Sequence, residues 1–201
     1  MNHFNLRPTA FLLSFSLLLT LFVPVPGLSQ KHPPSSAQVR IVVSGTSNVH
    51  DWDIKSDKGV CTSVFAVNSV GNLLGMSQLS FTIPAESLKS EHRGMDKNTY
   101  KALNTSKYHS IEFTAGSVDV KSAGKEKYML VSKGKLTIAG VSKDIVLTAT
   151  GSLNADNTIS YSGSYNLVLT DYKVEPPTAL LGTIKTGDKV VVKYDLVLKS
   201  M

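Results

Sequence analysis

The chain has 201 residues, a formal net charge of +6 and one cysteine, Cys61. A single cysteine excludes an internal disulfide, so hydrophobic burial and β-ladder hydrogen bonds must supply the stability. The lysines are scattered instead of clustering with aromatic residues, which disfavours nucleic-acid binding and is typical of a solvated surface. This charge is compatible with a weak, peripheral attraction to anionic lipid heads, and the sequence leaves a monomer and a homodimer both open.

Residues 1–29 are typical of a secretory signal peptide. Arg7 lies in a short polar start, and an apolar run over residues 10–25 follows it before the chain reaches prolines and a glycine. The run is too short to span a membrane comfortably, and Gly27-Leu28-Ser29 offers the small residues that a signal peptidase needs. We therefore expect cleavage after Ser29 and a periplasmic or secreted protein. The alternative is an uncleaved anchor helix, which the prolines disfavour.

The mature part is expected to form one domain. Removal of residues 1–29 leaves 172 of the 201 residues, which is enough for one sizeable core and rarely enough for two. Residues 30–36 are polar and contain two prolines, so we expect a flexible leader there. The folded domain is then expected over residues 37–201.

Apolar residues alternate with polar ones over most of this domain, which predicts half-buried strands. Val39, Ile41 and Val43 form the first such run. The other runs cover residues 79–83, 111–115, 136–138, 145–149, 161–169 and 190–198. Short turns are expected between strands at residues 68–72, 122–125, 139–142, 154–157 and 185–188. Such short connections favour an antiparallel sheet of consecutive strands, because parallel pairing would need crossovers of about a dozen residues or more.

One stretch, Met95 to Asn104, has a helical pattern instead. Met95, Thr99, Ala102 and Leu103 would share one side of a short helix. The helix could cap the interior of the fold or cover a sheet edge, and the sequence leaves both roles open.

About eight or nine strands with one helix fit either a closed barrel or a two-sheet sandwich. We favour the barrel, because closure removes edge strands and a barrel of eight strands has room for a small ligand. The expected fold is therefore all-β, an antiparallel eight-stranded lipocalin-like barrel with one short helix.

No motif predicts catalysis, and we expect neither an enzyme nor a cofactor. His50 and Asp51 are consecutive strand residues that would point to opposite faces. His50, His92, His109 and Cys61 lack the short ligand spacings of a zinc site. Neither a Gly-x-Ser-x-Gly elbow nor a phosphate-binding glycine loop occurs. A metal-assisted hydrolase using His50 and His109 is kept as an alternative, and so is an envelope stress protein that acts through its outer surface.

Several stretches resemble the YceI-like family. They are Gly45–Trp52, with its His-Asp-Trp, Phe81–Ser90, Lys101–Asn104, Lys107–Phe113, Gly134–Lys143 and Pro176–Ile184. One departure is His109, where many relatives have proline. The resemblance covers about Val39 to Leu198 and implies an exported protein whose lipocalin-like barrel holds an apolar lipid, either a polyisoprenoid or a quinone-type isoprenoid.

A long isoprenoid tail is uncharged, so its pocket needs only branched, aromatic and methionine side chains in a dry tunnel. Alternation, the helix, the late loop and the stretch around Trp52 give the candidate ligand-binding residues Trp52, Phe81, Ile83, Met95, Leu103, Phe113, Leu136, Ile138, Leu147, Tyr165, Leu167, Leu180 and Leu181. Burial of about ten methylene-sized groups at about 0.8 kcal/mol each would give about 8 kcal/mol before binding costs. A filled core and a lined tunnel share this pattern, so the sequence leaves open which of the two the barrel contains.

Overall fold

A computed structural model of the chain describes residues 30–31, 35–68, 72–154 and 158–199. The expected signal peptide lies outside these residues, so its cleavage stays a prediction. The elements are, in order, β1 (Gln30–Lys31), β2 (Ser35–Ser47), β3 (Asp51–Val67), β4 (Leu73–Pro84), the 3-10 helix η1 (Ala85–Ser87), α1 (Arg93–Leu103), β5 (Ser110–Gly124), β6 (Lys127–Ile138), β7 (Val141–Leu153), β8 (Thr158–Val168), the 3-10 helix η2 (Leu169–Tyr172), β9 (Thr178–Ala179) and β10 (Ile184–Lys199). Among the described residues, no helix is long and apolar enough to cross a lipid bilayer.

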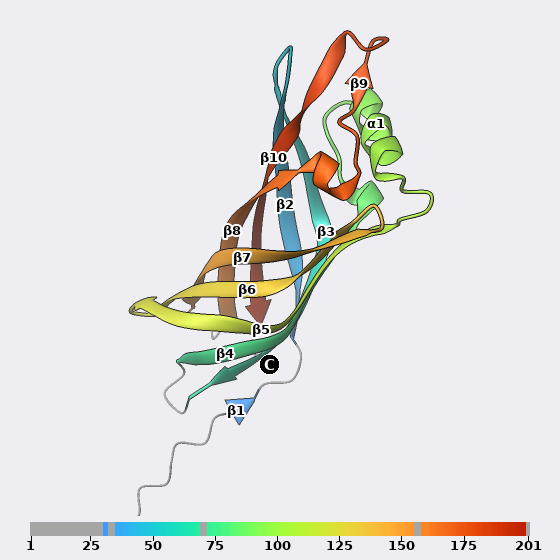
Figure 1. Cartoon of the computed structure of the whole chain (residues 1–201). Helices are drawn as coiled ribbons and strands as arrows, with labels where there is room; N and C mark the ends of the chain where they lie inside the picture. The colour runs from blue at the N-terminus through green and yellow to red at the C-terminus, as the bar shows by residue number, and fades with distance from the viewer. Residues whose placement is uncertain (1–29, 32–34, 69–71, 155–157, 200–201) are drawn as a thin grey trace, which may run out of the picture.

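The strands form a closed antiparallel barrel (Figure 1). Each of β2 to β8 pairs with its neighbour in the sequence, β8 pairs with β10, and β10 pairs with β2 to close the ring. These are eight barrel strands, while the two-residue strands β1 and β9 pair with the last residues of β3 and the first residues of β10. The predicted eight-stranded barrel with one helix is confirmed.

The buried apolar side chains of the barrel form two clusters, a larger one that we call the packed part and a second, smaller one. The packed part includes Phe65, Leu130, Ile159 and Leu198, which are almost completely buried and come from four different strands. The second cluster joins Ile54, Ala85, Leu88, Leu103, Ile138, Leu167, Tyr172, Val174 and Val190. This cluster brings α1, η1 and η2 together with the barrel, and α1 and β9 lie at one end of the molecule in Figure 1.

The helix begins two residues earlier than expected and ends at Leu103. Asn104 follows in the left-handed conformation, with a φ of 51°, and its N–H bonds back to the last turn of α1. Such a residue is a common helix terminator, because asparagine tolerates this conformation. Tyr100 then holds α1 against the segment after β4, since its hydroxyl donates to the carbonyl oxygens of Glu86 at 3.0 Å and Leu88 at 2.9 Å.

Two local expectations were wrong. Residues 185–188 do not form a turn between strands but lie inside β10, where the register shifts between Thr186 and Val190. Such a bulge inserts extra residues without ending a strand. The residues of a bulge can therefore have the same sequence pattern as a turn. The expected leader also contributes strands, because Gln30–Lys31 pair with Val67 and Ala66 of β3, and β2 already starts at Ser35. Backbone pairing along the edge of β3 needs no apolar side chains, so alternation could not reveal it.

Candidate functional site

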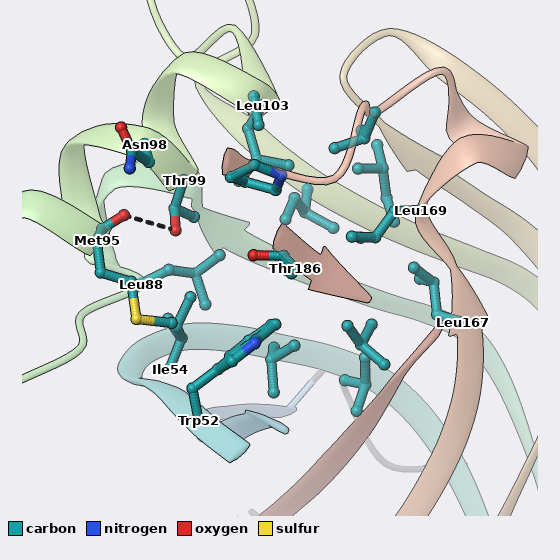
Figure 2. A pocket seen from close by; sticks show the side chains of 18 of the residues that line it. Trp52, Ile54, Leu88, Met95, Asn98, Thr99, Leu103, Leu167, Leu169 and Thr186 are labelled. Carbon is teal, nitrogen blue, oxygen red and sulfur yellow. Dashed lines mark hydrogen bonds between the residues drawn. The ribbon is translucent and has the colours of Figure 1, made fainter. Parts of the chain in front are cut away.

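A cavity of about 1040 Å³ lies inside the barrel, between its strands and α1 (Figure 2). Known small-molecule pockets measure about 300–1,000 Å³, so this cavity is large enough for a sizeable ligand. Its walls are predominantly aliphatic or aromatic. In Figure 2, Trp52 of β3 lies on the opposite side of the cavity from the helix residue Leu103.

All thirteen residues predicted as ligand contacts line this cavity. Eleven of them are buried or half-buried, whereas the side chains of Leu180 and Leu181 are 71% and 109% exposed and lie at its mouth. These two leucines were expected to face inward. Both adopt left-handed backbone conformations, with φ values of 49° and 57°, and this turn holds them at the surface. The thirteen candidates thus line the cavity, and their role in ligand binding stays a prediction.

The barrel interior is open on the side of α1 and filled with side chains in the packed part. Val43, Phe81, Leu147, Tyr165 and Val192 pack against the core but stay only partly buried, and all five line the cavity. An interior apolar side chain keeps this partial exposure when one of its sides faces empty space. The barrel is therefore hollow beside α1 and solid around Phe65 and Leu130.

Three lining aromatic residues pack against glycines of neighbouring strands. The Trp52 ring covers Gly45, Phe113 covers Gly134, and Tyr194 covers Gly163, so that a Cβ at any of these glycines would overlap the ring. Glycine within a strand often marks such a close approach. Each ring therefore takes up the space that a side chain at the facing glycine would need.

Sequence reasoning missed many lining residues. The main ones are Ile41, Val43, Ile54, Leu88, Ile111, Ile145, Leu169, Val190, Val192 and Tyr194. Several of these belong to alternating runs that were recognised in the sequence. Assigning every second residue of 39–43 and 190–198 to the barrel interior would have found them. Leu88 and Leu169 lie outside strands, so no period marked them.

Helix α1 caps the hollow part of the barrel. Met95, Thr99, Ala102 and Leu103, the residues predicted to share one side of the helix, all line the cavity. The Thr99 hydroxyl donates to the Met95 carbonyl oxygen at 3.0 Å, the bond drawn in Figure 2, so it presents mainly its methyl group to the cavity. The capping role is therefore the one that the structure supports.

Polar residues in the lining are few. They include Ser47, His50, His92, Lys97, Asn98, Thr178 and Thr186. Of the described residues that line the cavity, Lys97 is the only Lys, Arg, Asp or Glu. The cavity therefore suits a ligand with a long apolar part and at most a small polar end.

The structure gives no support to metal-assisted hydrolysis. Within the described ranges, no three His, Cys, Asp or Glu side chains are grouped closely enough to hold a metal ion. His50 lines the cavity and its Nδ1 lies 2.7 Å from the Asp51 carbonyl oxygen, whereas His109 is not part of the lining. The two histidines of this alternative therefore do not share one site.

Cys61 is completely buried in the packed part of the barrel, and burial raises the pKa of its thiol to about 12. We expect iodoacetamide at pH 8 to leave Cys61 unmodified in the folded protein and to modify it fully in urea, as followed by intact mass. Because the folded thiol holds its proton more tightly than the unfolded one, its contribution to stability is complete below the ordinary thiol pKa and is lost as pH rises towards 12. Rapid modification without denaturant would contradict this placement.

Comparison with known proteins agrees with the fold. The YceI-like domain matches residues 38–198 of the chain. The crystal structure of BcnA from Burkholderia cenocepacia is 20% identical, with a TM-score of 0.56, covering 81% of this chain and 95% of that one. A polyisoprenoid binding domain from Saccharophagus degradans, implicated in plant cell wall breakdown, is 13% identical, with a TM-score of 0.61, covering 85% of this chain and 99% of that one. A search of curated proteins found no match.

At these identities, the two solved structures support the fold alone. The domain match is of a different kind, because it spans most of the chain and nearly the whole described barrel. The chain belongs to the YceI-like family.

Proposed function

We propose that the protein is an exported, non-enzymatic carrier that holds an isoprenoid-type lipid in its barrel. The observation that carries this proposal is the cavity of about 1040 Å³ with predominantly apolar walls. Water in such a space gains few hydrogen bonds, so an apolar chain that replaces it is favoured. The polyisoprenoid binding domain from Saccharophagus degradans, which has the same fold, supports the choice of an isoprenoid. Export rests on the pattern of residues 1–29 alone.

The single tryptophan of the chain provides the test. Trp52 lines the cavity, and its Nε1 donates to the Thr46 carbonyl oxygen at 3.0 Å, which fixes the ring. Delipidated protein titrated with geranylgeraniol should show a saturable change in Trp52 emission, with an affinity in the micromolar range or tighter. Octanol serves as the control, because it buries far fewer methylene groups and should bind much more weakly. No saturable change with geranylgeraniol would count against the proposal.

The mouth of the cavity has the features of a membrane-docking surface. Leu181, Leu180 and Val49 are the three most exposed large apolar side chains of the described chain, at 109%, 71% and 61%. Asn48 links their two turns, because its side chain donates to the Thr183 carbonyl oxygen and accepts from the Lys185 N–H. Exposed leucines close to a lysine, here Lys185, favour contact with the surface of an anionic bilayer. An apolar ligand would enter the cavity from that bilayer.

We therefore expect the protein to co-sediment with phosphatidylglycerol-containing vesicles through this mouth. The double substitution Leu180→Ser/Leu181→Ser should weaken vesicle binding at least about tenfold, since two leucines that enter the interface are lost. The matched control Leu74→Ser/Val146→Ser removes two exposed apolar side chains that do not line the cavity. Equal losses in both double variants, or no binding by the wild type, would rule out this docking surface.

A further inference from the structure

The cavity ends at a floor that separates it from the packed part of the barrel. A second void of about 20 Å³ lies beyond this floor, and Phe81, Leu147 and Tyr194 line both spaces. The second void has room for about one water molecule and is bounded mainly by apolar residues, which include Cys61, Leu130 and Leu198. A ligand chain can therefore go no deeper unless the three shared side chains give way.

Two of these side chains are held firmly. The Phe81 ring packs against both Tyr194 and Phe113, with centroid distances of 6.1 Å to each. Tyr194 lies over Gly163 of β8, which faces it directly in the ladder. Its hydroxyl donates to the Thr148 carbonyl oxygen on β7 at 3.2 Å.

The bond to Thr148 has a structural reason. The ladder between β7 and β8 starts at the pair Ala149 and Gly163, so Thr148 lies one residue past its end. The Tyr194 hydroxyl satisfies a carbonyl oxygen that β8 no longer reaches. Burial raises the pKa of Tyr194 to about 12, so the phenol remains a donor at neutral pH. The floor is thus fixed to the barrel wall at the point where two strands separate.

We propose that Phe81 and Tyr194 set the greatest length of apolar chain that the protein accepts. This inference rests on the proposed function and adds a length limit to it. The ring that Phe81→Ala removes holds about as many carbon atoms as one isoprene unit, and its loss would join the two spaces. The residues beyond are almost completely buried, so the limit can move by about one unit and no further.

The test uses isoprenoid alcohols that lengthen by one unit at a time from farnesol, with Trp52 emission as the readout. Wild-type affinity should rise with length up to a limit and then stop rising. Phe81→Ala and Tyr194→Leu should each move this limit one unit longer, with at least about tenfold tighter binding of that alcohol than the wild type shows. Tyr194→Phe keeps the ring and should keep the limit.

Met95→Ala is the matched control at the other end of the cavity. It should change the affinity for all lengths together and leave the limit in place. If Phe81→Ala does not fold, the length limit is measured in Phe81→Leu and Tyr194→Leu instead. An unchanged limit in folded floor variants, or a wild type without a limit, would overturn the inference alone. A wild type that binds no alcohol of any length would overturn the proposed function as well.

Discussion

The double substitution Val43→Phe/Val192→Phe is expected to weaken lipid binding at least about 100-fold while the barrel stays folded. Val43 on β2 and Val192 on β10 are directly paired, and both line the cavity. Two phenylalanine side chains there would occupy the space of several methylene groups of a ligand, each worth about 0.8 kcal/mol. The empty cavity can take the rings without overpacking, and neighbouring aromatic residues on paired strands stabilise each other.

Isothermal titration with geranylgeraniol measures this loss, and thermal unfolding of the lipid-free protein checks the fold. Val42→Phe is the matched control, because its side chain alternates with Val43 on β2 and does not line the cavity. It should bind like the wild type. A double variant that binds as tightly as the wild type would place the ligand elsewhere, for instance on the outer surface.

The second large effect that we expect is a difference in stability loss between substitutions in the packed part of the barrel and substitutions in the hollow part. Leu130 and Leu136 lie on β6, but Leu130 is 1% exposed in the packed core and Leu136 is half-buried at the cavity. In the lipid-free protein, we expect Leu130→Ala to lower the free energy of unfolding by about 3–5 kcal/mol and Leu136→Ala by only about 1–2 kcal/mol. The difference arises because one side of Leu136 already faces empty space.

Urea unfolding of the two variants, followed by circular dichroism, gives the comparison. Saturation with lipid should enlarge the relative cost of Leu136→Ala, because the ligand packs against that side chain only in the folded protein. Equal costs in the lipid-free protein would mean that the barrel is filled evenly from end to end.

Much of the barrel could be predicted from the sequence, because alternation reports which side of a strand is buried. That period placed Phe81, Phe113 and Leu147 correctly on the cavity wall. It could not show that the cavity is open, because a residue that faces an empty space and one that faces a packed core require the same apolar side chain. Gly163 illustrates the limit, since its importance depends on the register that places it opposite Tyr194.

Features that depend on backbone conformation or on pairing at strand edges could not be predicted from the sequence either. The exposure of Leu180 and Leu181 follows from two consecutive left-handed residues before Gly182, and leucine gives no signal of such a turn. The bulge in β10 contains Gly187 and Asp188, a pair that is typical of turns. Asp188 instead accepts hydrogen bonds from the N–H and the hydroxyl of Thr170, which join β10 to η2.

Native mass spectrometry of the intact protein, purified without detergent from the cells that make it, tests the central claim most directly. The account predicts a species heavier than the polypeptide by the mass of an isoprenoid-type lipid, which solvent extraction removes, and the same spectrum gives the number of subunits. A spectrum that shows the bare polypeptide, both as purified and after incubation with isoprenoids, would contradict the account.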